Sequence, residues 1–507
     1  MRKYFLSTLS FLLICTLAQA QVTKEDVKFF DEECSRAFST FKPVGLSVAV
    51  IRDGKLVYKN ALGYADIQSG EKLTTAHNFN IASCSKAFTS ACIGLLVEEG
   101  KLHWNDKVVD ILPEFRLSDP WITNELTVTD LLCHRSGLKT FEGDLLWYGS
   151  DYSDSVIMHR MRYLPIEQEF RSSFGYQNLM YMVAGEVIKK VSGKTWEDFL
   201  QERLLSPLGM NHSAAVFGKL PKGLPLAMPH YDGKRIPITL FNSVKPAGAV
   251  FSNVEDLANW TSMLMNDGKL GEQIILKPNT LRQLFAAKTI IGVSTFNQQN
   301  GINFRAYGLG WFMFDFGGKK ILEHDGGMPG YISKVMVIPS EKLAFVILNN
   351  SQDGYVNDAL KFQLLTRFLK VEKKDWITEM AGFRKSNEEE TKKEMDERIA
   401  SRVPGTQPSL ALAGYCGIFN DDTYGKAEVK LENDLLKLTL LPSAGILSGT
   451  LEHWHYNTFK VTFRDETLNF GLITFSLDAA GKVTGFKIDL PSGDFHFNDL
   501  DFKKQPE

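Results

Sequence analysis

The sequence lacks the signatures of several protein classes. Its 507 residues hold six cysteines without paired spacing, so we expect neither a disulfide framework nor a zinc site. The 57 Lys and Arg residues nearly balance the 60 Asp and Glu residues, and no basic block stands out, which argues against nucleic acid as a partner. Beyond the first 20 residues, no run is apolar enough to cross a bilayer. A G-x-S-x-G elbow is also missing, which disfavours an α/β-hydrolase.

The first 20 residues are typical of a signal peptide. Residues 1–3 are positively charged at Arg and Lys, residues 5–17 form a short apolar run, and residues 18–20 read Ala-Gln-Ala, a cleavage motif. We therefore expect an exported protein, periplasmic or extracellular. Cys15 raises the alternative of a lipoprotein anchor, but the isoleucine before it is not the small residue that such processing prefers.

Ser83 and Lys86 form the most informative pattern in the chain. Apolar spacing predicts a buried helix over residues 83–99, ended by Gly100. Positions i and i+3 share a helix face, so the Lys86 amine can reach the Ser83 hydroxyl and activate it as a nucleophile. The alternatives are an ordinary surface helix, or a thiol nucleophile at Cys84, for which no activating histidine lies nearby in the sequence.

Two later motifs complete a recognisable order. Tyr176-Gln177-Asn178 comes first, and His324-Asp325-Gly326 follows, with Gly327 next. With the S-x-x-K pair, this order resembles the penicillin-recognising serine hydrolases, a family of class C β-lactamases, D-aminopeptidases, D-alanyl carboxypeptidases and esterases. The resemblance covers roughly residues 30–370, with supporting phrases at residues 131–138, 246–252 and 307–311.

The resemblance implies roles for the motif residues. Ser83 would attack an acyl carbon and form an acyl-enzyme, while Lys86 and Tyr176 share the proton transfer. Which of the two is the base stays open. Asn178 would hold Lys86 and the substrate amide. Alternatively, or in addition, it would cap the helix that follows.

The resemblance also implies an oxyanion hole and a strand that the substrate approaches. The hole would consist of the backbone N–H groups of Ser83 and Gly327. Gly326 and Gly327 would let the substrate backbone come close to that strand, unless they merely form a tight turn. No cofactor or metal is implied, and the expected partner is a small-molecule or peptide substrate.

His324 departs from the lysine that β-lactamases and penicillin-binding proteins usually carry. A histidine is largely neutral at neutral pH, which weakens the case for substrates with a carboxylate. We therefore expect ester or D-aminoacyl amide substrates. The alternatives are a β-lactamase or D-alanyl-D-alanine carboxypeptidase, and a non-catalytic binding protein of the same fold. Such a binding protein would usually have lost Lys86 or Tyr176.

The expected fold class is α+β, with an antiparallel sheet flanked by helices and an all-helical subdomain. This domain would span residues 21–375, with its first and last strands in one sheet and its last helix beginning near Asp358. A charged helical linker would follow at residues 376–409.

In residues 410–507, apolar and polar residues alternate in short segments, a pattern that predicts short strands and a small all-β barrel. The segment resembles a lipocalin-like module of unknown function. We find no catalytic constellation in it and interpret His453-Trp454-His455 as surface residues. A chain ending near Lys385 is therefore expected to fold and keep its reactive serine. The sequence gives no indication of the oligomeric state.

Overall fold

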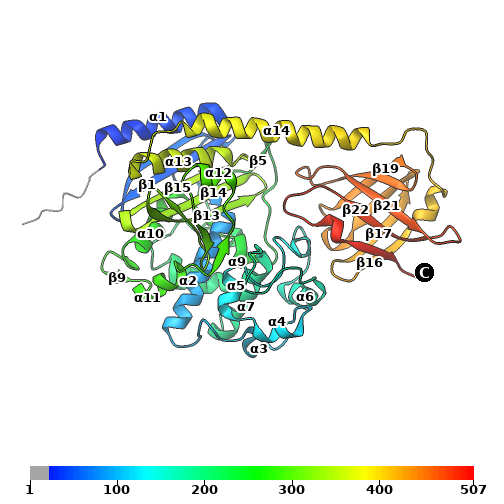
Figure 1. The fold of residues 1–507 in the computed structure, drawn as a ribbon, viewed down its shortest axis with the longest axis horizontal. Coiled ribbons are helices and arrows are strands. Elements are labelled where there is room, and N and C mark those ends of the chain that lie inside the picture. Colours follow the sequence, from blue (N-terminus) through cyan, green and yellow to red (C-terminus); the bar gives the residue numbers. More distant parts are fainter. Residues whose placement is uncertain (1–21, 507) are drawn as a thin grey trace, which may run out of the picture.

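The computed structural model describes residues 22–506, so the predicted signal peptide lies outside the described residues. A main domain extends from α1 (Lys24–Phe41) to α13 (Tyr355–Leu369), and α14 (Trp376–Ala400) runs from it to a separate barrel (Figure 1). In this part of the chain, no helix combines the length and apolar character needed to span a membrane.

A nine-stranded antiparallel sheet forms the centre of the main domain, in the order β10-β11-β12-β13-β14-β15-β1-β2-β3. The expectation that the first and last strands share one sheet is confirmed, because β1 pairs with both β15 and β2. The bounds are β1 Gly45–Arg52, β2 Lys55–Asp66, β3 Glu71–Lys72, β10 Thr289–Ile291, β11 Arg305–Tyr307, β12 Phe312–Phe316, β13 Lys319–Met328, β14 Tyr331–Ile338 and β15 Leu343–Asn349.

Both faces of this sheet are buried, because successive strand residues point to opposite sides. Val48 and Val50 of β1 belong to one apolar core, which includes residues of α1 and α13. Ala49 and Ile51 belong to a second core, which includes residues of α2 and α10. The nearly continuous apolar run of β1 follows from this two-sided cover.

The helical part of the main domain lies largely between β3 and β10. Its helices are α2 Ser85–Glu98, α3 Val108–Ile111, α4 Pro120–Glu125, α5 Val128–Leu132, α6 Asp154–Arg160, α7 Asn178–Ser192, α8 Trp196–Leu200, α9 Lys245–Gly248, α10 Val254–Met265, α11 Pro278–Leu284 and α12 Thr295–Gln299. Three two-stranded sheets accompany them, namely β4 Phe79–Asn80 with β7 Phe251–Ser252, β5 His230–Tyr231 with β6 Lys234–Arg235, and β8 Lys269–Leu270 with β9 Gln273–Ile274.

Two predicted helix boundaries differ from the observed ones. The helix expected over residues 83–99 begins at Ser85, after a separate 3-10 turn at Ala82–Cys84. The last helix of the main domain begins at Tyr355, three residues before Asp358, with Gly354 at the N-cap. The Asp353 side chain accepts a hydrogen bond from the Tyr355 N–H (2.8 Å), which stabilises the turn that leads into the helix.

The C-terminal strands close into an eight-stranded antiparallel barrel, as the alternation predicts. Its strands are β16 Gly417–Asp421, β17 Gly425–Glu432, β18 Leu435–Leu440, β19 Ser448–His455, β20 Thr458–Phe463, β21 Gly471–Leu477, β22 Val483–Asp489 and β23 Asp501–Lys504. Aromatic side chains that pack edge-to-face or stacked fill the interior, among them Phe419, Phe459, Phe475, Phe486 and Phe502. The barrel therefore encloses a packed core.

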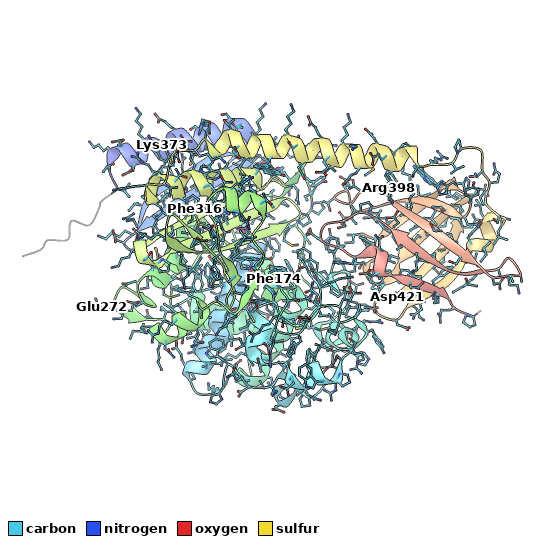
Figure 2. The ribbon with its side chains drawn as sticks, viewed as in Figure 1. Phe174, Glu272, Phe316, Lys373, Arg398 and Asp421 are labelled. Carbon is cyan, nitrogen blue, oxygen red and sulfur yellow. The ribbon has the colours of Figure 1, made fainter. Side chains whose placement is uncertain are left out.

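Several contacts fix the barrel to the rest of the chain. Arg398, labelled at the barrel end of α14 in Figure 2, donates a hydrogen bond to Asp489 (2.8 Å). On the main domain, the segment that contacts the barrel is residues 139–160. Within it, Arg160 donates a hydrogen bond to the Thr423 carbonyl oxygen of the barrel (2.9 Å). Leu145 of this segment is even part of the barrel's own apolar core. The main domain and the barrel therefore form a specific interface.

Gly149 provides a test of this interface. A side chain at Gly149 would bring its Cβ within 2.1 Å of Ile446 Cδ1 on the barrel, whereas Gly193 has nothing within 4 Å. Both glycines have a positive φ, 60° and 73°, so alanine adds similar backbone strain at each position. We expect Gly149→Ala to make the segment between α14 and the barrel more sensitive to limited proteolysis and to lower the melting temperature more than Gly193→Ala. Equal behaviour of the two variants would contradict the interface.

Candidate active site

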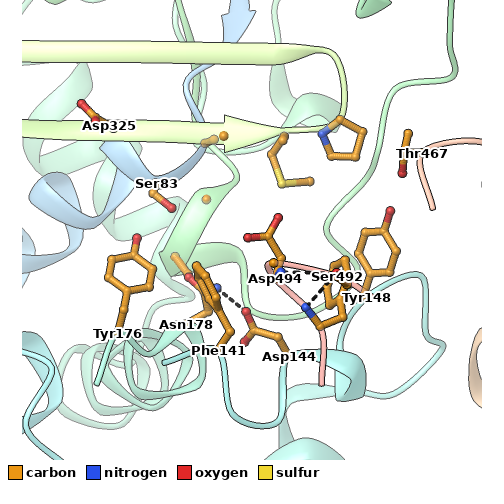
Figure 3. A pocket seen from close by; sticks show the side chains of 18 of the residues that line it. Ser83, Phe141, Asp144, Tyr148, Tyr176, Asn178, Asp325, Thr467, Ser492 and Asp494 are labelled. Carbon is orange, nitrogen blue, oxygen red and sulfur yellow. Dashed lines mark hydrogen bonds between the residues drawn. The ribbon is translucent and has the colours of Figure 1, made fainter. Parts of the chain in front are cut away.

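Ser83 lies in a strained turn that holds it at the edge of a cavity (Figure 3). The preceding residue, Ala82, has a φ of 45°, a left-handed conformation that costs a non-glycine residue about 1 kcal/mol or more. Its N–H donates a 2.6 Å hydrogen bond to Asn80 Oδ1, which stabilises this conformation. The turn thereby leaves Ser83 half-buried while its neighbours Ala82 and Cys84 are buried.

Lys86 is fully buried in the first turn of α2, beside Ser83. Its Nζ lies 3.1 Å from Ser83 Oγ, 2.6 Å from Asn178 Oδ1 and 2.9 Å from the Ala247 carbonyl oxygen. Burial lowers the pKa of Lys86 to about 7, although the nearby Asp144 acts in the opposite direction. In a neutral amine, the Asn178 and Ala247 oxygens accept both N–H groups, so the lone pair faces the Ser83 hydroxyl.

Asn178 connects Lys86 to a buried carboxyl group that the motifs did not reveal. It is the first residue of α7, and Gln177 occupies the N-cap position, so the alternative in which Asn178 caps this helix is wrong. Its Nδ2 donates to Asp144 Oδ2 at 2.6 Å (Figure 3). Burial raises the pKa of Asp144 to about 7. No motif marks Asp144 in the sequence.

Tyr176 stays protonated at neutral pH in this environment. Burial raises the pKa of the phenol well above its usual value, and a hydrogen bond with Ser83 only partly offsets that rise. The Lys86 ammonium lies 4.8 Å from the centre of the Tyr176 ring, and the His134 ring packs on it at 4.3 Å. His134 also accepts a hydrogen bond from the Gln177 N–H (3.0 Å), which fixes the backbone beside Tyr176.

His324 is buried on β13 as a neutral ring. Its Nδ1 lies 2.7 Å from the Asp325 carbonyl oxygen, which can only accept, so Nδ1 carries the proton. Nε2 then accepts from the Tyr307 hydroxyl at 2.8 Å. Burial and the nearby Lys86 charge lower the pKa of His324 to about 3. A protonated His324 is therefore not present at neutral pH to stabilise a Tyr176 phenolate.

The two glycines after His324 have different surroundings. Gly327 lines the cavity, and a Cβ added to it would meet Ile332 only at 3.7 Å, an ordinary contact distance. Gly326 is buried, and a Cβ there would lie 2.2 Å from the Ile81 carbonyl oxygen and 2.3 Å from Ser333 Oγ. Gly326 therefore lets β13 approach the turn that carries Ser83. The alternative of a simple tight turn is wrong, since both glycines lie within β13.

Cys84 does not have the properties of a nucleophile. Its thiol is buried against the His324 carbonyl oxygen (3.0 Å) and Ser333 Oγ (3.3 Å). Burial raises the pKa of the Cys84 thiol to about 12, so it is not a thiolate at neutral pH.

The cavity beside Ser83 has a volume of about 1010 Å³ and extends to the barrel. Ser83, Tyr176, Asn178, His324 and Gly327 line one side, and barrel residues 467–469 and 491–495 line another. The barrel thus forms part of the cavity wall, whereas the prediction that a chain ending near Lys385 folds and keeps its reactive serine stays a prediction. Sequence reasoning missed this contribution because the barrel loops carry no motif and reach the cavity only through domain packing.

One group of side chains could hold a metal ion. Among the described residues, Glu142, His496 and Asp499 form the one set of three potential ligands with ligand atoms within 4.8 Å of one another. The Lys139 ammonium lies 3.3 Å from the Glu142 carboxylate and 2.7 Å from that of Asp499. A lysine therefore already provides the positive charge between these acids. His453 and His455 are not part of this set.

Comparison with known protein families assigns both parts of the chain. Residues 36–368 match the β-lactamase family, and residues 401–504 match a domain of unknown function, DUF3471. The first match covers more than half of the chain and contains Ser83, Lys86, Tyr176 and His324.

Several curated proteins are similar to the chain. The unguisins hydrolase ungD of Aspergillus violaceofuscus is 27% identical, over 80% of this chain and 76% of its own length. Penicillin-binding protein 4 of Amycolatopsis lactamdurans is 26% identical, over 60% of this chain and 80% of its own length.

Solved structures share the fold at lower identity. The octameric penicillin-binding protein homologue from Pyrococcus abyssi has a TM-score of 0.59 at 22% identity, covering 94% of this chain and 100% of its own. SurE with D-Leu has a TM-score of 0.56 at 19% identity, covering 95% of this chain and 100% of its own.

The Lys86 environment predicts a pH dependence for the reactivity of Ser83. Labelling by a fluorophosphonate should speed up as pH rises through about 7, because Lys86 then loses its proton and accepts the one from Ser83. Asp144→Asn removes a carboxylate that raises the pKa of Lys86, so this rise should move to lower pH. Tyr176→Phe should slow labelling without moving the rise. A rise that begins only above about pH 9 in the unmodified protein would contradict the lowered pKa of Lys86, because that is where an ordinary lysine titrates.

Proposed function

The chain belongs to the β-lactamase family, and we propose that it is an exported serine hydrolase that acts on ester or amide substrates of the aminoacyl or peptide type. The observation that carries this proposal is the Lys86 amine, 3.1 Å from Ser83 Oγ, with a pKa lowered to about 7. An amine with this pKa can accept the serine proton near neutral pH.

In the proposed reaction, Lys86 takes the Ser83 proton as Oγ attacks the acyl carbon. The carbonyl oxygen becomes an oxyanion, for which the backbone N–H groups of Ser83 and Gly327 are the proposed donors. As the bond to the alcohol or amine leaving group breaks, that group takes a proton from Tyr176, which recovers one from Lys86. Water then attacks the acyl-enzyme, and its proton passes to Lys86. As the bond between the acyl carbon and Oγ breaks, Lys86 gives this proton to Oγ, which releases the acid and restores free Ser83 and the neutral amine.

The cavity walls favour neutral or cationic substrates over anionic ones. His324, at the position where a lysine usually meets a substrate carboxylate, is neutral and has both ring nitrogens engaged. Among the described residues that line the cavity there is neither lysine nor arginine. These observations support ester or aminoacyl amide hydrolysis over the β-lactamase and D-alanyl-D-alanine carboxypeptidase alternatives.

Two further findings support the proposal. The similar unguisins hydrolase carries the name of a hydrolase, and the main domain retains the full S-x-x-K and Y-x-N sets, which a non-catalytic relative would usually have lost. Export, to the periplasm or the exterior, rests on the sequence pattern of residues 1–20.

The nucleophile assignment predicts the behaviour of Ser83→Ala. This variant should lose fluorophosphonate labelling and ester hydrolysis, by a factor of about 10³ or more, while its thermal unfolding stays nearly unchanged. Ser90→Ala is the matched control, because Ser90 lies on the same helix but outside the cavity lining. Hydrolysis by purified Ser83→Ala at a rate near that of Ser90→Ala would remove Ser83 as the nucleophile.

Because His324 is neutral, we predict that the protein does not prefer substrates with a free carboxylate. Blocking that carboxylate as a methyl ester tests this prediction. A β-lactam and its methyl ester differ in the carboxylate, and we expect the unmodified protein to gain nothing from the free carboxylate at about pH 8. His324→Lys supplies a cation and should raise relative activity on the carboxylate form about ten- to a hundredfold. Efficient hydrolysis of the free acid by the unmodified protein, unaffected by His324→Ala, would contradict this assignment.

A further inference from the structure

The barrel contributes an ordered loop to the cavity, and this loop carries an acid. Within the loop, the Ser492 hydroxyl accepts hydrogen bonds from the N–H groups of Asp494 (3.3 Å) and Phe495 (3.1 Å) (Figure 3). The Phe495 ring packs on Tyr148 of the main domain, with 4.2 Å between ring centres. The loop is thereby fixed on both sides of Asp494.

The charged residues that line the cavity are all acidic among those the structure describes. They are Asp144, Asp325, Glu394 and Asp494. Lys334 neutralises Asp325 at 2.5 Å, and Asn178 donates to Asp144. Within the described chain, neither Glu394 nor the Asp494 carboxylate has an ion pair or a side-chain hydrogen bond. Glu394 is exposed on α14, whereas Asp494 lies on the barrel loop and is desolvated by the surrounding protein.

Asp494 therefore lacks a counter-charge where a substrate would lie. Its side chain is exposed and lines the cavity, and in the view of Figure 3 its carboxylate lies between Ser83 and Tyr148. The surrounding protein nevertheless raises the pKa of Asp494 by desolvation, and no neighbouring cation offsets this effect. A bound ammonium group would supply the missing charge.

The rest of the cavity suits an apolar group. Trp147 and Phe241 stack with 5.4 Å between ring centres, and both line the cavity, as do Phe141 and Phe312. Such rings bury aliphatic or aromatic side chains and also attract cations.

We propose that Asp494 of the barrel binds the protonated amino group of the acyl donor, so that the enzyme selects aminoacyl esters and amides with a bulky apolar side chain. The proposal rests on the proposed function, which it narrows to one substrate class. The barrel then has a direct role in specificity, while the proton transfer stays with the main domain.

The proposal can be tested by comparing the hydrolysis of two substrates, one with an amino group and one without it. Phenylalanine p-nitroanilide, in both enantiomers, carries the ammonium group, and 3-phenylpropionyl p-nitroanilide lacks it. Asp494→Asn should lower kcat/KM on the better phenylalanine enantiomer about ten- to a hundredfold and leave the neutral anilide unchanged. Asp434→Asn, at an exposed barrel turn outside the cavity lining, is the matched control and should change neither value.

A binding measurement separates this proposal from the proposed function. In a Ser83→Ala background, calorimetry should show that phenylalaninamide binds more tightly than 3-phenylpropionamide, and that Asp494→Asn removes the difference. This result stands even if the unmodified protein hydrolyses none of the anilides, which would count against the proposed function alone. Equal binding of the two amides, or an equal loss on both anilides in Asp494→Asn, would overturn the role of Asp494.

Discussion

The burial of one amine, that of Lys86, is the constraint on which the site depends. A buried amine is costly unless its N–H groups are hydrogen-bonded, and here the acceptors come from the nucleophile turn, α7 and α9. The same burial lowers the pKa of Lys86 to about 7, which is what its proposed role as a base near neutral pH requires. The proposed activation of Ser83 therefore depends on the packing of helices distant in sequence, including the carbonyl of Ala247.

The sequence predicted the parts of the structure that depend on local spacing. The i, i+3 relation of Ser83 and Lys86 and the alternation of the barrel strands both follow from short-range periodicity. The family-like segments at residues 246–252 and 307–311 also contribute to the site. The Ala247 carbonyl oxygen accepts a hydrogen bond from Lys86, and the Tyr307 hydroxyl donates one to His324.

Interactions between distant segments escaped prediction. Asp144 carries no motif, and only the fold brings it to Asn178. The state of His324 depends on burial and on Tyr307, neither of which spacing reveals. Gly326 appeared as room for a substrate, whereas its missing side chain makes room for the chain's own Ile81 carbonyl. The contribution of the barrel to the cavity is a matter of domain packing, which no local pattern encodes.

The filled interior of the barrel has a consequence for how such an enzyme can diversify. Because aromatic side chains such as Phe475 and Phe486 already occupy that interior, its loops can vary in length and composition without unsettling the fold that presents them. Residues 467–469 and 491–495 line the cavity, and none of them has a role in proton transfer in the proposed reaction. Substitutions in the barrel loops can thus change substrate selectivity, while the proposed reaction chemistry in the main domain stays the same.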